Sequence, residues 1–443
     1  MVTFARFLSL MTKIYISVSG IKHLKLGTTM KDTIILAYSG GLDTSVLIKW
    51  LQEEYNVDVI TFTMELGQKS NLNKVEEKAK KLGAKKHYSI DGTKEFITNY
   101  VFPAIKANAL YEGKYPMATA LGRPLIAKKL VEIAQKEGAI AVAHGCTGKG
   151  NDQVRFDITV KALAPDLKVM APVREWGMCR EAEIKYAKQK GIPIPHLADP
   201  YSIDQNIWGR SIECGPLENA EQEPLEEIYT LTTSPEKAPD KPESVTIQFE
   251  AGVPAGLNGK KMNPVVLIEK LNEIAGKHGV GRVDHIEDRL VGIKSREIYE
   301  SPAAEVLIEA HKDMEKMILT RHELEFKKHI DEKWTWLVYT GLWIDPLREA
   351  LDAFIDKTQE RVCGEVKMKL YKGRCWATGR SSPMSLYDKN LATYEVETSF
   401  NQTFAEGFIE LWGLPTKVAV VLKEKVKKEK NVNGADSYGC LFQ

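Results

Sequence analysis

Short apolar runs alternate with longer amphipathic stretches over the first half of the chain. The runs Thr33–Leu36, Val57–Phe62 and Ala139–Ala143 are rich in β-branched or apolar residues and predict strands. Between them, Asn71–Leu82 and Arg123–Lys136 place apolar residues at helical spacing. Strands that alternate with helices of this length predict a mostly parallel sheet, and ligands bind such sheets at the carboxyl ends of the strands.

The pattern changes near residues 193–200, where three prolines interrupt it, and we place a domain boundary there. Beyond this point strand-like runs and long helical stretches are mixed, which predicts an α+β arrangement. The predicted strands are Val245–Glu250, Leu290–Lys294 and Glu365–Leu370, and the predicted helices are Pro264–Lys277, Pro302–Ile330 and Pro346–Gly364.

The chain is therefore expected to be an α/β protein whose parts follow one another in sequence. A parallel-sheet domain over 31–196 is followed by an α+β domain over 197–399, a helix over 400–430 and a loose tail over 431–443. Residues 1–30 form an extension that begins with 29 residues lacking any acid. This extension is interpreted as a mis-assigned start before Met30, a weak targeting peptide or a dispensable disordered segment.

A glycine pair follows the first predicted strand. Residues 37–45 read Ala-Tyr-Ser-Gly-Gly-Leu-Asp-Thr-Ser and lead into an apolar helical stretch. Glycines let an anion approach the backbone closely, and the N–H groups of a helix N-terminus attract negative charge. Ser39, Thr44 and Ser45 add hydroxyl donors, and Asp43 could hold a metal ion. The loop predicts a phosphate or pyrophosphate site, although it matches neither a Walker A loop nor a dinucleotide fingerprint; the alternative is an ordinary capped helix.

A second polar loop follows the strand at Ala139–Ala143. It reads His-Gly-Cys-Thr-Gly-Lys-Gly-Asn-Asp-Gln-Val-Arg-Phe over residues 144–156, and it is expected to face the same crevice as the first loop. Asp152 can hold an ammonium group, and Arg155 can hold a carboxylate through two parallel hydrogen bonds, so the pair suits an amino acid. The alternative is a capped loop before a helix over Gln153–Leu163, and His144 is expected to have a structural role.

Composition narrows the range of partners. The 443 residues include 43% hydrophobic and 27% charged residues, and the formal net charge is +1, which argues against a nucleic-acid or membrane partner. No apolar run reaches the about 18 residues of a membrane-spanning helix. The six cysteines include no C-x-x-C pair, so the chain is expected to be reduced and cytoplasmic, without a zinc ribbon or a dithiol centre.

The two loops together resemble those of the argininosuccinate synthases. The first, S-G-G-x-D-[ST]-[ST], resembles the PP-loop of the N-type ATP pyrophosphatases, to which that family belongs. The resemblance extends from about Lys31 to near Lys430, with several motifs in the same order. Besides the loops, these motifs are 115–119 (Tyr-Pro-Met-Ala-Thr), 201–206 (Tyr-Ser-Ile-Asp-Gln-Asn), 287–289 (Glu-Asp-Arg), 294–299 (Lys-Ser-Arg-Glu-Ile-Tyr) and 400–403 (Phe-Asn-Gln-Thr).

The resemblance implies a ligase that joins L-citrulline to L-aspartate at the expense of ATP, in arginine biosynthesis and the urea cycle. The ureido oxygen of citrulline is a poor leaving group, so adenylation to citrullyl-AMP releases pyrophosphate, and the α-amine of aspartate then displaces AMP. The resemblance also implies Mg²⁺ with ATP and a cytoplasmic homotetramer. No general base is assigned, although a phosphate of the substrate could serve.

The resemblance further implies roles for individual positions. Ser39, Asp43, Asp152 and Arg155 are implied to be catalytic, and no residue is assigned as a dedicated metal ligand. The implied ATP contacts are Ala37, Tyr38, Ser39, Gly40, Gly41, Leu42, Asp43, Thr44, Ser45, Met64 and Gly145. The implied aspartate contacts are Thr147, Asn151 and Asp152, the implied citrulline contacts are Tyr115, Asn151, Arg155, Ser202, Ser211, Glu287 and Tyr299, and Thr119 lies close to both substrates.

Two features of the sequence, at position 120 and near the end of the chain, are not fully explained by the resemblance. Ala120 stands where many members of the family have serine, so one side-chain contact is missing. Near the end of the chain, Phe404, Phe408 and Trp412 follow Phe400 at i, i+4 spacing and make one helical face very apolar. That face is interpreted either as core packing or as the oligomerisation helix of the implied homotetramer.

Two other functions are considered. A different PP-loop enzyme, such as a tRNA thiolation enzyme or a glutamine-hydrolysing synthetase, would call for a basic surface, a cysteine pair or an amidotransferase segment with a nucleophilic cysteine. A nucleotide-binding regulator without turnover would not need Asp43, Asp152 and Arg155 to be intact. The net charge and the scattered cysteines argue against a different PP-loop enzyme. The presence of the three charged residues argues against a regulator without turnover.

Overall fold

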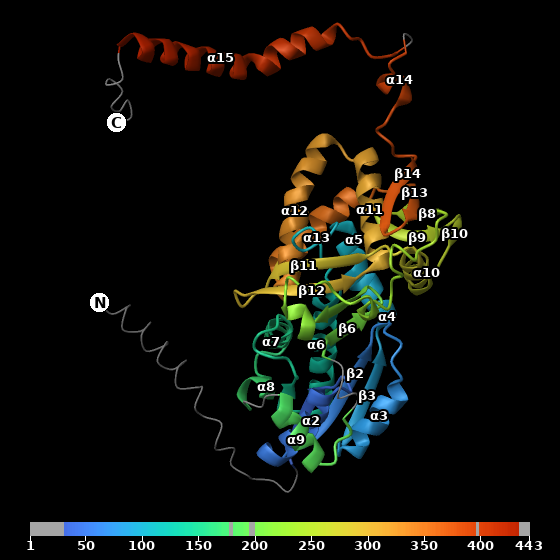
Figure 1. Cartoon of the computed structure of the whole chain (residues 1–443), viewed down its shortest axis with the longest axis vertical. Helices are drawn as coiled ribbons and strands as arrows, with labels where there is room; N and C mark the ends of the chain where they lie inside the picture. The colour runs from blue at the N-terminus through green and yellow to red at the C-terminus, as the bar shows by residue number, and fades with distance from the viewer. Residues whose placement is uncertain (1–30, 177–179, 195–199, 396–397, 434–443) are drawn as a thin grey trace. The chain divides into compact units, whose positions relative to one another are not determined.

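The computed structural model describes residues 31–176, 180–194, 200–395 and 398–433 of the chain (Figure 1). Two compact units are present, the first ending at Met384 and the second beginning at Ser385. The predicted extension over 1–30 lies outside the described residues, as does the predicted tail from residue 434 onward. The predicted boundary near residue 196 falls inside the first unit and stays a prediction.

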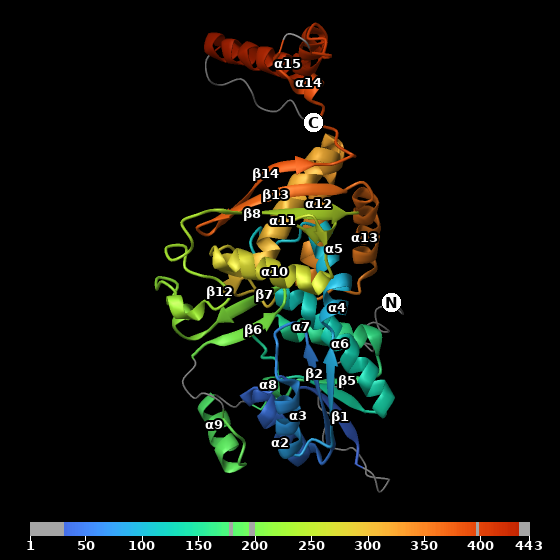
Figure 2. The same cartoon turned by 90° about the vertical axis from the view of Figure 1, so that its right-hand side faces the viewer.

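Five parallel strands form the sheet of the N-terminal half, in the order β3-β2-β1-β4-β5. Figure 2 shows β1 and β2 side by side. The predicted parallel sheet is confirmed. Because β1 and β4 are neighbours although β2 and β3 separate them in sequence, the loops that follow β1 and β4 leave the same edge of the sheet side by side. The strands are β1 (Thr33–Ala37), β2 (Asp58–Glu65), β3 (Lys86–Asp91), β4 (Ala141–Ala143) and β5 (Lys168–Met170).

Alternation along β1 sends its side chains into two cores. Ile34 and Leu36 belong to the same buried cluster as the apolar residues of α2 (Leu42–Tyr55), whereas Ile35 belongs to the cluster that contains those of α6 (Ala118–Glu137). Both faces of the sheet are therefore covered, which explains the continuous apolar runs of its strands. The α6 cluster continues into the second half of the chain, so both halves of the first unit share one core.

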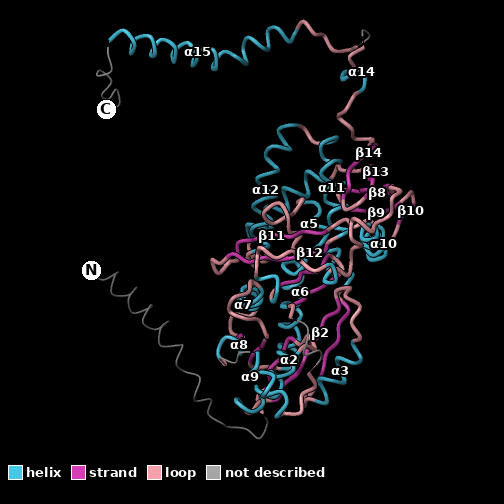
Figure 3. The backbone as a smooth tube through the Cα atoms, viewed as in Figure 1, coloured by secondary structure: helices cyan, strands magenta, loops and turns pink. Residues whose placement is uncertain are grey.

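Two antiparallel sheets and a group of helices form the rest of the first unit, which confirms the predicted α+β arrangement. One sheet has the order β11-β12-β7-β6, and Figure 3 shows β11 and β12 side by side. The other has the order β10-β9-β8-β13-β14. The strands are β6 (Ser202–Asn206), β7 (Gly209–Glu213), β8 (Glu243–Glu250), β9 (Val253–Leu257), β10 (Lys260–Lys261), β11 (Arg282–Asp288), β12 (Lys294–Glu300), β13 (Gly364–Tyr371) and β14 (Arg374–Ser381).

Helices connect and cover these sheets. In the N-terminal half, besides α2 and α6, they are α3 (Leu72–Lys81), α4 (Thr93–Phe96), the π-helical turn η1 (Ile97–Val101), α5 (Phe102–Lys106), α7 (Asp152–Leu163), α8 (Pro172–Glu175) and α9 (Arg180–Gln189). In the second half they are the short turns η2 (Gly215–Glu218) and η3 (Glu226–Ile228), then α10 (Pro264–Lys277), α11 (Pro302–Ile318), α12 (Arg321–Tyr339) and α13 (Pro346–Gln359).

Several predicted segments of the second half are wrong in detail. The predicted strand Leu290–Lys294 is mostly the turn of the β11–β12 hairpin, where Gly292 has φ +85° and only the last residue begins β12. The predicted helix Pro302–Ile330 is two helices, because Thr320 caps the second one. The predicted helix Pro346–Gly364 ends at Gln359, and Gly364 already begins β13.

The second unit contains the short helix α14 (Lys389–Ala392) and the long helix α15 (Phe404–Asn433). The predicted helix over 400–430 begins only at Phe404, so Phe400 lies before it and is not part of its apolar face. The rest of the predicted apolar and basic stretches lies on α15, which includes the first three residues of the predicted tail. The rings of Phe408 and Trp412 stack with their centroids 5.6 Å apart, and both side chains are more than half exposed. Among the helices in the described ranges, none is both long enough and apolar enough to cross a membrane.

A capping box fixes the start of α12. The backbone N–H of Glu323 donates to Thr320 Oγ1 at 3.2 Å, and the Thr320 N–H donates to Glu323 Oε2 at 2.9 Å. We expect Thr320→Ala to lower the free energy of unfolding by about 1 kcal/mol, because the Glu323 N–H loses its acceptor. Thr320→Ser keeps that acceptor and should retain most of the stability in urea unfolding. Equal losses in both variants would contradict the role of the hydroxyl.

Candidate active site

The two glycine loops and one face of the β6–β7–β12–β11 sheet enclose a cavity of about 230 Å³. Every residue predicted to contact citrulline or aspartate lines this cavity, whereas only Asp43 and Gly145 of the predicted ATP contacts do so. The lining residues are Asp43, Tyr115, Thr119, Gly145, Cys146, Thr147, Gly150, Asn151, Asp152, Arg155, Ser202, Ile203, Asp204, Ser211, Glu213, Glu287, Arg289, Glu297 and Tyr299.

Strand register explains how distant polar residues reach the cavity together. Ser211 on β7 lies opposite Asp204 on β6 and opposite Tyr299 on β12. Because alternate side chains of a strand point to the same face, Ser202 and Glu297 share that face with their neighbours two residues away. One sheet face thus carries hydroxyl and carboxylate groups from three strands into one wall of the cavity.

The first loop has the geometry of an anion site. Gly40 has φ +81°, a conformation that favours glycine, and α2 begins two residues later. The hydroxyls of Ser39 and Thr44 lie 3.1 Å apart, and the Gly41 N–H donates to Ser39 Oγ at 3.2 Å. Hydroxyl and N–H donors therefore gather at a helix N-terminus, as an anion requires.

Other residues of this loop are buried. The Ser45 hydroxyl, fully buried, donates to the Gly41 carbonyl at 2.6 Å and lies 3.2 Å from the Tyr38 hydroxyl. Leu42 is buried in the core beside Tyr38. Lys78, from α3, was not predicted and donates to the Gly40 carbonyl at 2.6 Å. The Ser45 hydroxyl thus supports the loop from inside.

The two glycine loops pack directly against each other. A Cβ atom placed on Gly145 would lie 3.1 Å from Cγ2 of Thr44, so a larger residue at this position would push the loops apart. The His144 ring is buried just before Gly145, with Nε2 2.8 Å from Asp157 Oδ1, and it accepts from the Cys146 N–H through Nδ1 at 3.2 Å. This placement agrees with the structural role expected for His144.

Met64 and Ala37 lie at the carboxyl ends of β2 and β1, outside the residues that line the cavity. Met64 is buried, and its carbonyl accepts from Gln68 Nε2 at 3.0 Å. Ala120 is fully buried in α6 and does not line the cavity. The missing serine at position 120 is thus a difference inside the core of the first unit.

Asp152 is held between two guanidinium groups. Arg123 Nε donates to Asp152 Oδ2 at 2.8 Å, and Arg155 Nη1 donates to Asp152 Oδ1 at 2.7 Å. Arg123 also forms an ion pair with Asp204. Burial would raise the pKa of the Asp152 carboxyl, but the two arginines outweigh it and lower that pKa to about 2. Asp152 is therefore a carboxylate at any ordinary pH.

Arg155 is anchored by the end of α12. Its Nε and Nη2 both donate to the carbonyl of Tyr339, at 3.0 and 2.9 Å, and its guanidinium lies 5.0 Å from the Tyr339 ring centroid. Gly341, with φ +83°, lets the chain pass Arg155 closely, because a Cβ there would lie 3.0 Å from Arg155 Cα. The edge of Arg155 that remains next to the cavity is Nη1, 3.5 Å from Thr119 Oγ1.

A buried hydrogen-bond network joins Glu287, on the sheet wall of the cavity, to the end of α12 and to the second loop. Glu287 accepts from Tyr299 at 2.7 Å and from Tyr339 at 2.6 Å, and the Tyr339 hydroxyl accepts from Asn151 Nδ2 at 2.8 Å. The rings of Tyr115 and Tyr299 stack with centroids 4.0 Å apart. Glu287 therefore brings a buried negative charge to the cavity, held by two phenolic donors.

A second charged group lies on the same sheet face. Arg289 donates to Glu297 Oε1 at 2.6 Å and also pairs with Glu213. Burial raises the pKa of Glu297 well above the usual range of a carboxyl group, and the neighbouring Glu213 adds to the rise although Arg289 opposes it. This cluster therefore favours the protonated form of Glu297.

Sequence reasoning missed Arg123, Tyr339, Glu213 and Glu297. Arg123 was assigned to the start of a helix, and Tyr339 ends a helix about 50 residues beyond Glu287, so neither position carries a local signal of function. The alternation of the strand over Lys294–Glu300 could have indicated Glu297, because Tyr299 lies two residues away on the same face.

The donor set near the first loop fits Mg²⁺ bound together with a nucleotide. Asp43 lies in the first turn of α2 and lines the cavity. Mg²⁺ with ATP needs only one or two carboxylates, because phosphate oxygens and water supply the other ligands. Over the described ranges, no group of three or more His, Cys, Asp or Glu residues could hold a metal ion by itself.

Comparison with known proteins gives matches along most of the chain. Residues 33–193 match the model of the arginosuccinate synthase N-terminal HUP domain, and residues 201–419 match that of the arginosuccinate synthase C-terminal domain. The argininosuccinate synthase of Pyrococcus furiosus is 58% identical over 400 residues, covering 90% of this chain and 97% of the relative. That of Dehalococcoides mccartyi is 53% identical over 402 residues, covering 90% of this chain and 99% of the relative.

Among solved structures, the U34-tRNA thiolase NcsA from Methanococcus maripaludis is 16% identical to this chain and has a TM-score of 0.27. The match covers 40% of this chain and 63% of the thiolase. A similarity at this level supports no statement about the function of the chain.

The protonation of Glu297 beside Glu213 can be tested by infrared spectroscopy. We expect Glu297 to remain a protonated carboxylic acid at a pH above the usual range of a carboxyl group. Difference infrared spectra from about pH 6 to about pH 10 should show its carbonyl band disappear, and Glu297→Gln should lack that change. Glu213→Gln removes the neighbouring negative charge and should move the titration to lower pH. A spectrum without a Glu297-dependent band at neutral pH would contradict this account.

Proposed function

The chain belongs to the argininosuccinate synthase family, and on that premise we propose how its residues join L-citrulline to L-aspartate. The protein is a ligase that uses ATP and forms argininosuccinate, a step of arginine biosynthesis. One observation supports our assignment of roles most strongly. A single cavity next to the phosphate-type loop presents arginine, carboxylate and hydroxyl groups together, which two amino acids and an activated ureido group require.

In the first step, the ureido oxygen of citrulline forms a bond to the α-phosphorus of ATP. The bond from that phosphorus to the pyrophosphate group breaks, which gives citrullyl-AMP and pyrophosphate. We assign the leaving pyrophosphate to the first loop, where the helix N-terminus and the hydroxyls of Ser39 and Thr44 offer donors to its developing charge. The remaining ATP contacts predicted at Ala37–Ser45, Met64 and Gly145 are part of the same proposal.

Mg²⁺ supplies positive charge to the phosphate oxygens when it is bound with ATP. We propose that Asp43 holds it, because this carboxylate lies in the first turn of α2 and lines the cavity. The catalytic assignment of Asp43 rests on this position.

We place citrulline against the sheet wall. Its ammonium group is assigned to the buried Glu287, its carboxylate to the Nη1 edge of Arg155, and its ureido group to the neighbouring serines and tyrosines. Because two donors of Arg155 already bind the Tyr339 carbonyl, the carboxylate would meet one edge of the guanidinium beside Thr119. The ureido contacts proposed are Tyr115, Ser202, Ser211 and Tyr299.

We place aspartate at the second loop, against Thr147, Asn151 and Asp152. Asp152 already accepts hydrogen bonds from Arg123 and Arg155, so its oxygens orient the substrate amine through their remaining lone pairs. In the second step this amine forms a bond to the ureido carbon, the bond from that carbon to the AMP oxygen breaks, and argininosuccinate and AMP result. Positioning of the amine is the main contribution of the protein to this step.

We also propose a cytoplasmic homotetramer. In the part of the chain that the structure describes, the cysteines are unpaired, as expected in a reducing compartment. The helix α15 exposes large apolar side chains, including Phe408 at 61% and Trp412 at 69%, and such a face calls for a partner. A second copy of this chain is the partner that we propose for it.

A substitution at Tyr339 tests the citrulline site. In the unchanged protein, pyrophosphate release under multiple turnover should require both amino acids. Tyr339→Phe should raise the KM for citrulline by about tenfold, with a smaller change in kcat. The reason is that Glu287 loses one of two donors and the Asn151 amide loses its acceptor, a cost of about 1–2 kcal/mol.

Tyr387→Phe is the matched control, because Tyr387 is exposed and its hydroxyl has no hydrogen-bonding partner among the described residues of the second unit. An unchanged KM for citrulline in Tyr339→Phe would contradict the assigned site. No pyrophosphate release with both amino acids, under conditions where ATP binds, would contradict the assigned reaction.

The oligomerisation proposal is tested by light scattering. We expect the intact chain to have the mass of four copies, and the double variant Phe408→Glu, Trp412→Glu to dissociate, because charges on this face oppose its burial. Lys417→Gln changes an exposed position of the same helix and should leave the mass unchanged. A double variant with the mass of the intact protein would refute the role of this face.

A further inference from the structure

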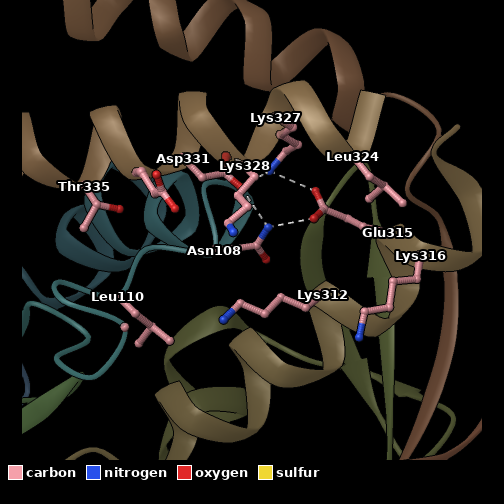
Figure 4. Close-up of a pocket in the computed structure, with 12 residues that line it drawn as sticks. Asn108, Leu110, Lys312, Glu315, Lys316, Leu324, Lys327, Lys328, Asp331 and Thr335 are labelled. Carbon is pink, nitrogen blue, oxygen red and sulfur yellow. Dashed lines mark hydrogen bonds and ion pairs between the residues drawn. The ribbon is translucent and has the colours of Figure 1, made fainter. Parts of the chain in front are cut away.

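A second cavity, of about 460 Å³, lies in the first unit between α11, α12 and residues 108–113 (Figure 4). None of its lining residues lines the candidate active site. Its size is within the range of about 300–1,000 Å³ that is typical of small-molecule sites. The cavity is therefore a separate place at which the protein could bind a ligand.

One side of this cavity is a closed network of charges. Lys327 is only 1% exposed, and its ammonium group lies 3.0 Å from Glu315, 2.8 Å from Asp331 and 2.7 Å from the Lys106 carbonyl. Asn108 Nδ2 donates to Glu315 and Asp331 at 2.7 and 3.0 Å, as the dashed lines in Figure 4 indicate. The buried lysine is thus satisfied by its own carboxylates and needs no ligand.

The other lysines of the cavity are different. Lys312 and Lys316 on α11 and Lys328 on α12 also line it, and within the described residues no hydrogen bond or ion pair engages their ammonium groups. Lys312 is half-buried, and burial lowers the pKa of its ammonium group. A partly desolvated cation without a hydrogen-bonding partner is unfavourable, because buried charges in proteins are normally paired.

We propose that this cavity binds a small multivalent anion with carboxylate or phosphate groups, held by Lys312, Lys316 and Lys328. A bound anion would offset the repulsion between Lys312 and Lys316 and would give Lys312 the hydrogen-bonding partner that it lacks. Lysine ammonium groups bind such anions as point charges. The carboxylates of the lining are Glu332 and the two that bind Lys327, so the anion contacts the part of the cavity lined by Lys312, Lys316 and Lys328.

The apolar part of the lining indicates the body of the ligand. Leu110 and Leu324 line the cavity together with the aliphatic stems of the lysines. A short carbon chain carrying carboxylates would contact these groups, whereas inorganic phosphate would use only the charges. Citrate therefore serves as the probe for a carboxylate ligand with a carbon body, and inorganic phosphate as the probe for a phosphate ligand.

The test uses the full chain and measures each lysine separately. Limited acetylation followed by peptide mass spectrometry, with increasing citrate or phosphate, should show at least severalfold protection of Lys312 and Lys328. Lys333, exposed on α12 with its ammonium group 4.0 Å from the Trp336 ring centroid, is the internal control and should react equally throughout. Stronger protection by citrate would identify a carboxylate ligand with a carbon body, and stronger protection by phosphate would identify a phosphate ligand.

Variants test the same site by calorimetry. The double variant Lys312→Met, Lys328→Met should bind the protecting anion at least tenfold more weakly, whereas Lys333→Met should bind it like the unchanged protein. An unchanged unfolding midpoint of the double variant ensures that lost binding reflects the lost charges. Lack of protection by both probes, equal protection by chloride at the same ionic strength, or full affinity in the double variant would overturn the proposal. None of these outcomes bears on the ligase activity.

Discussion

The geometry of the candidate active site depends on one partly buried carboxylate that binds two guanidinium groups. Asp152 at the start of α7 binds Arg123 from α6 and Arg155 from its own helix, and Arg123 also reaches Asp204 on β6. Arg155 in turn binds the carbonyl at the end of α12. Arg155 is buried, and leaving a buried charge without its partner typically costs about 3–5 kcal/mol, so this cluster fixes the parallel-sheet half against the antiparallel sheet and α12.

The two halves of the first unit contribute different chemistry to the cavity. The loops that leave β1 and β4 provide backbone donors and hydroxyls at a helix N-terminus, which suit phosphate groups. The face of the β6–β7–β12–β11 sheet provides carboxylates, serines and tyrosines in fixed register, which suit an amino acid. Because one core joins the halves, the activated ureido group and the attacking amine can be held at a constant distance and orientation.

The sequence predicts the parts of this arrangement that depend on local patterns. The parallel sheet, the two glycine loops and their common edge follow from alternating strands and helices, because the positions of β1 and β4 in such a sheet are constrained. The residues of the sheet wall, such as Ser211 and Tyr299, were assigned only through the resemblance to a family. Taken alone, their side chains look like ordinary surface residues.

Other features could not be predicted, because they depend on contacts between distant segments. Arg123 and Tyr339 lie within and at the end of helices, and only tertiary packing brings them beside Asp152 and Glu287. The turn at 290–293 was mistaken for a strand because Leu290, Val291 and Ile293 are apolar, although Val291 and Ile293 are exposed at the tip of a hairpin.

The fate of the ureido oxygen of citrulline tests the central claim most directly. With citrulline labelled by ¹⁸O in that oxygen, we predict label in AMP and none in pyrophosphate, whereas label in pyrophosphate would contradict adenylation of citrulline.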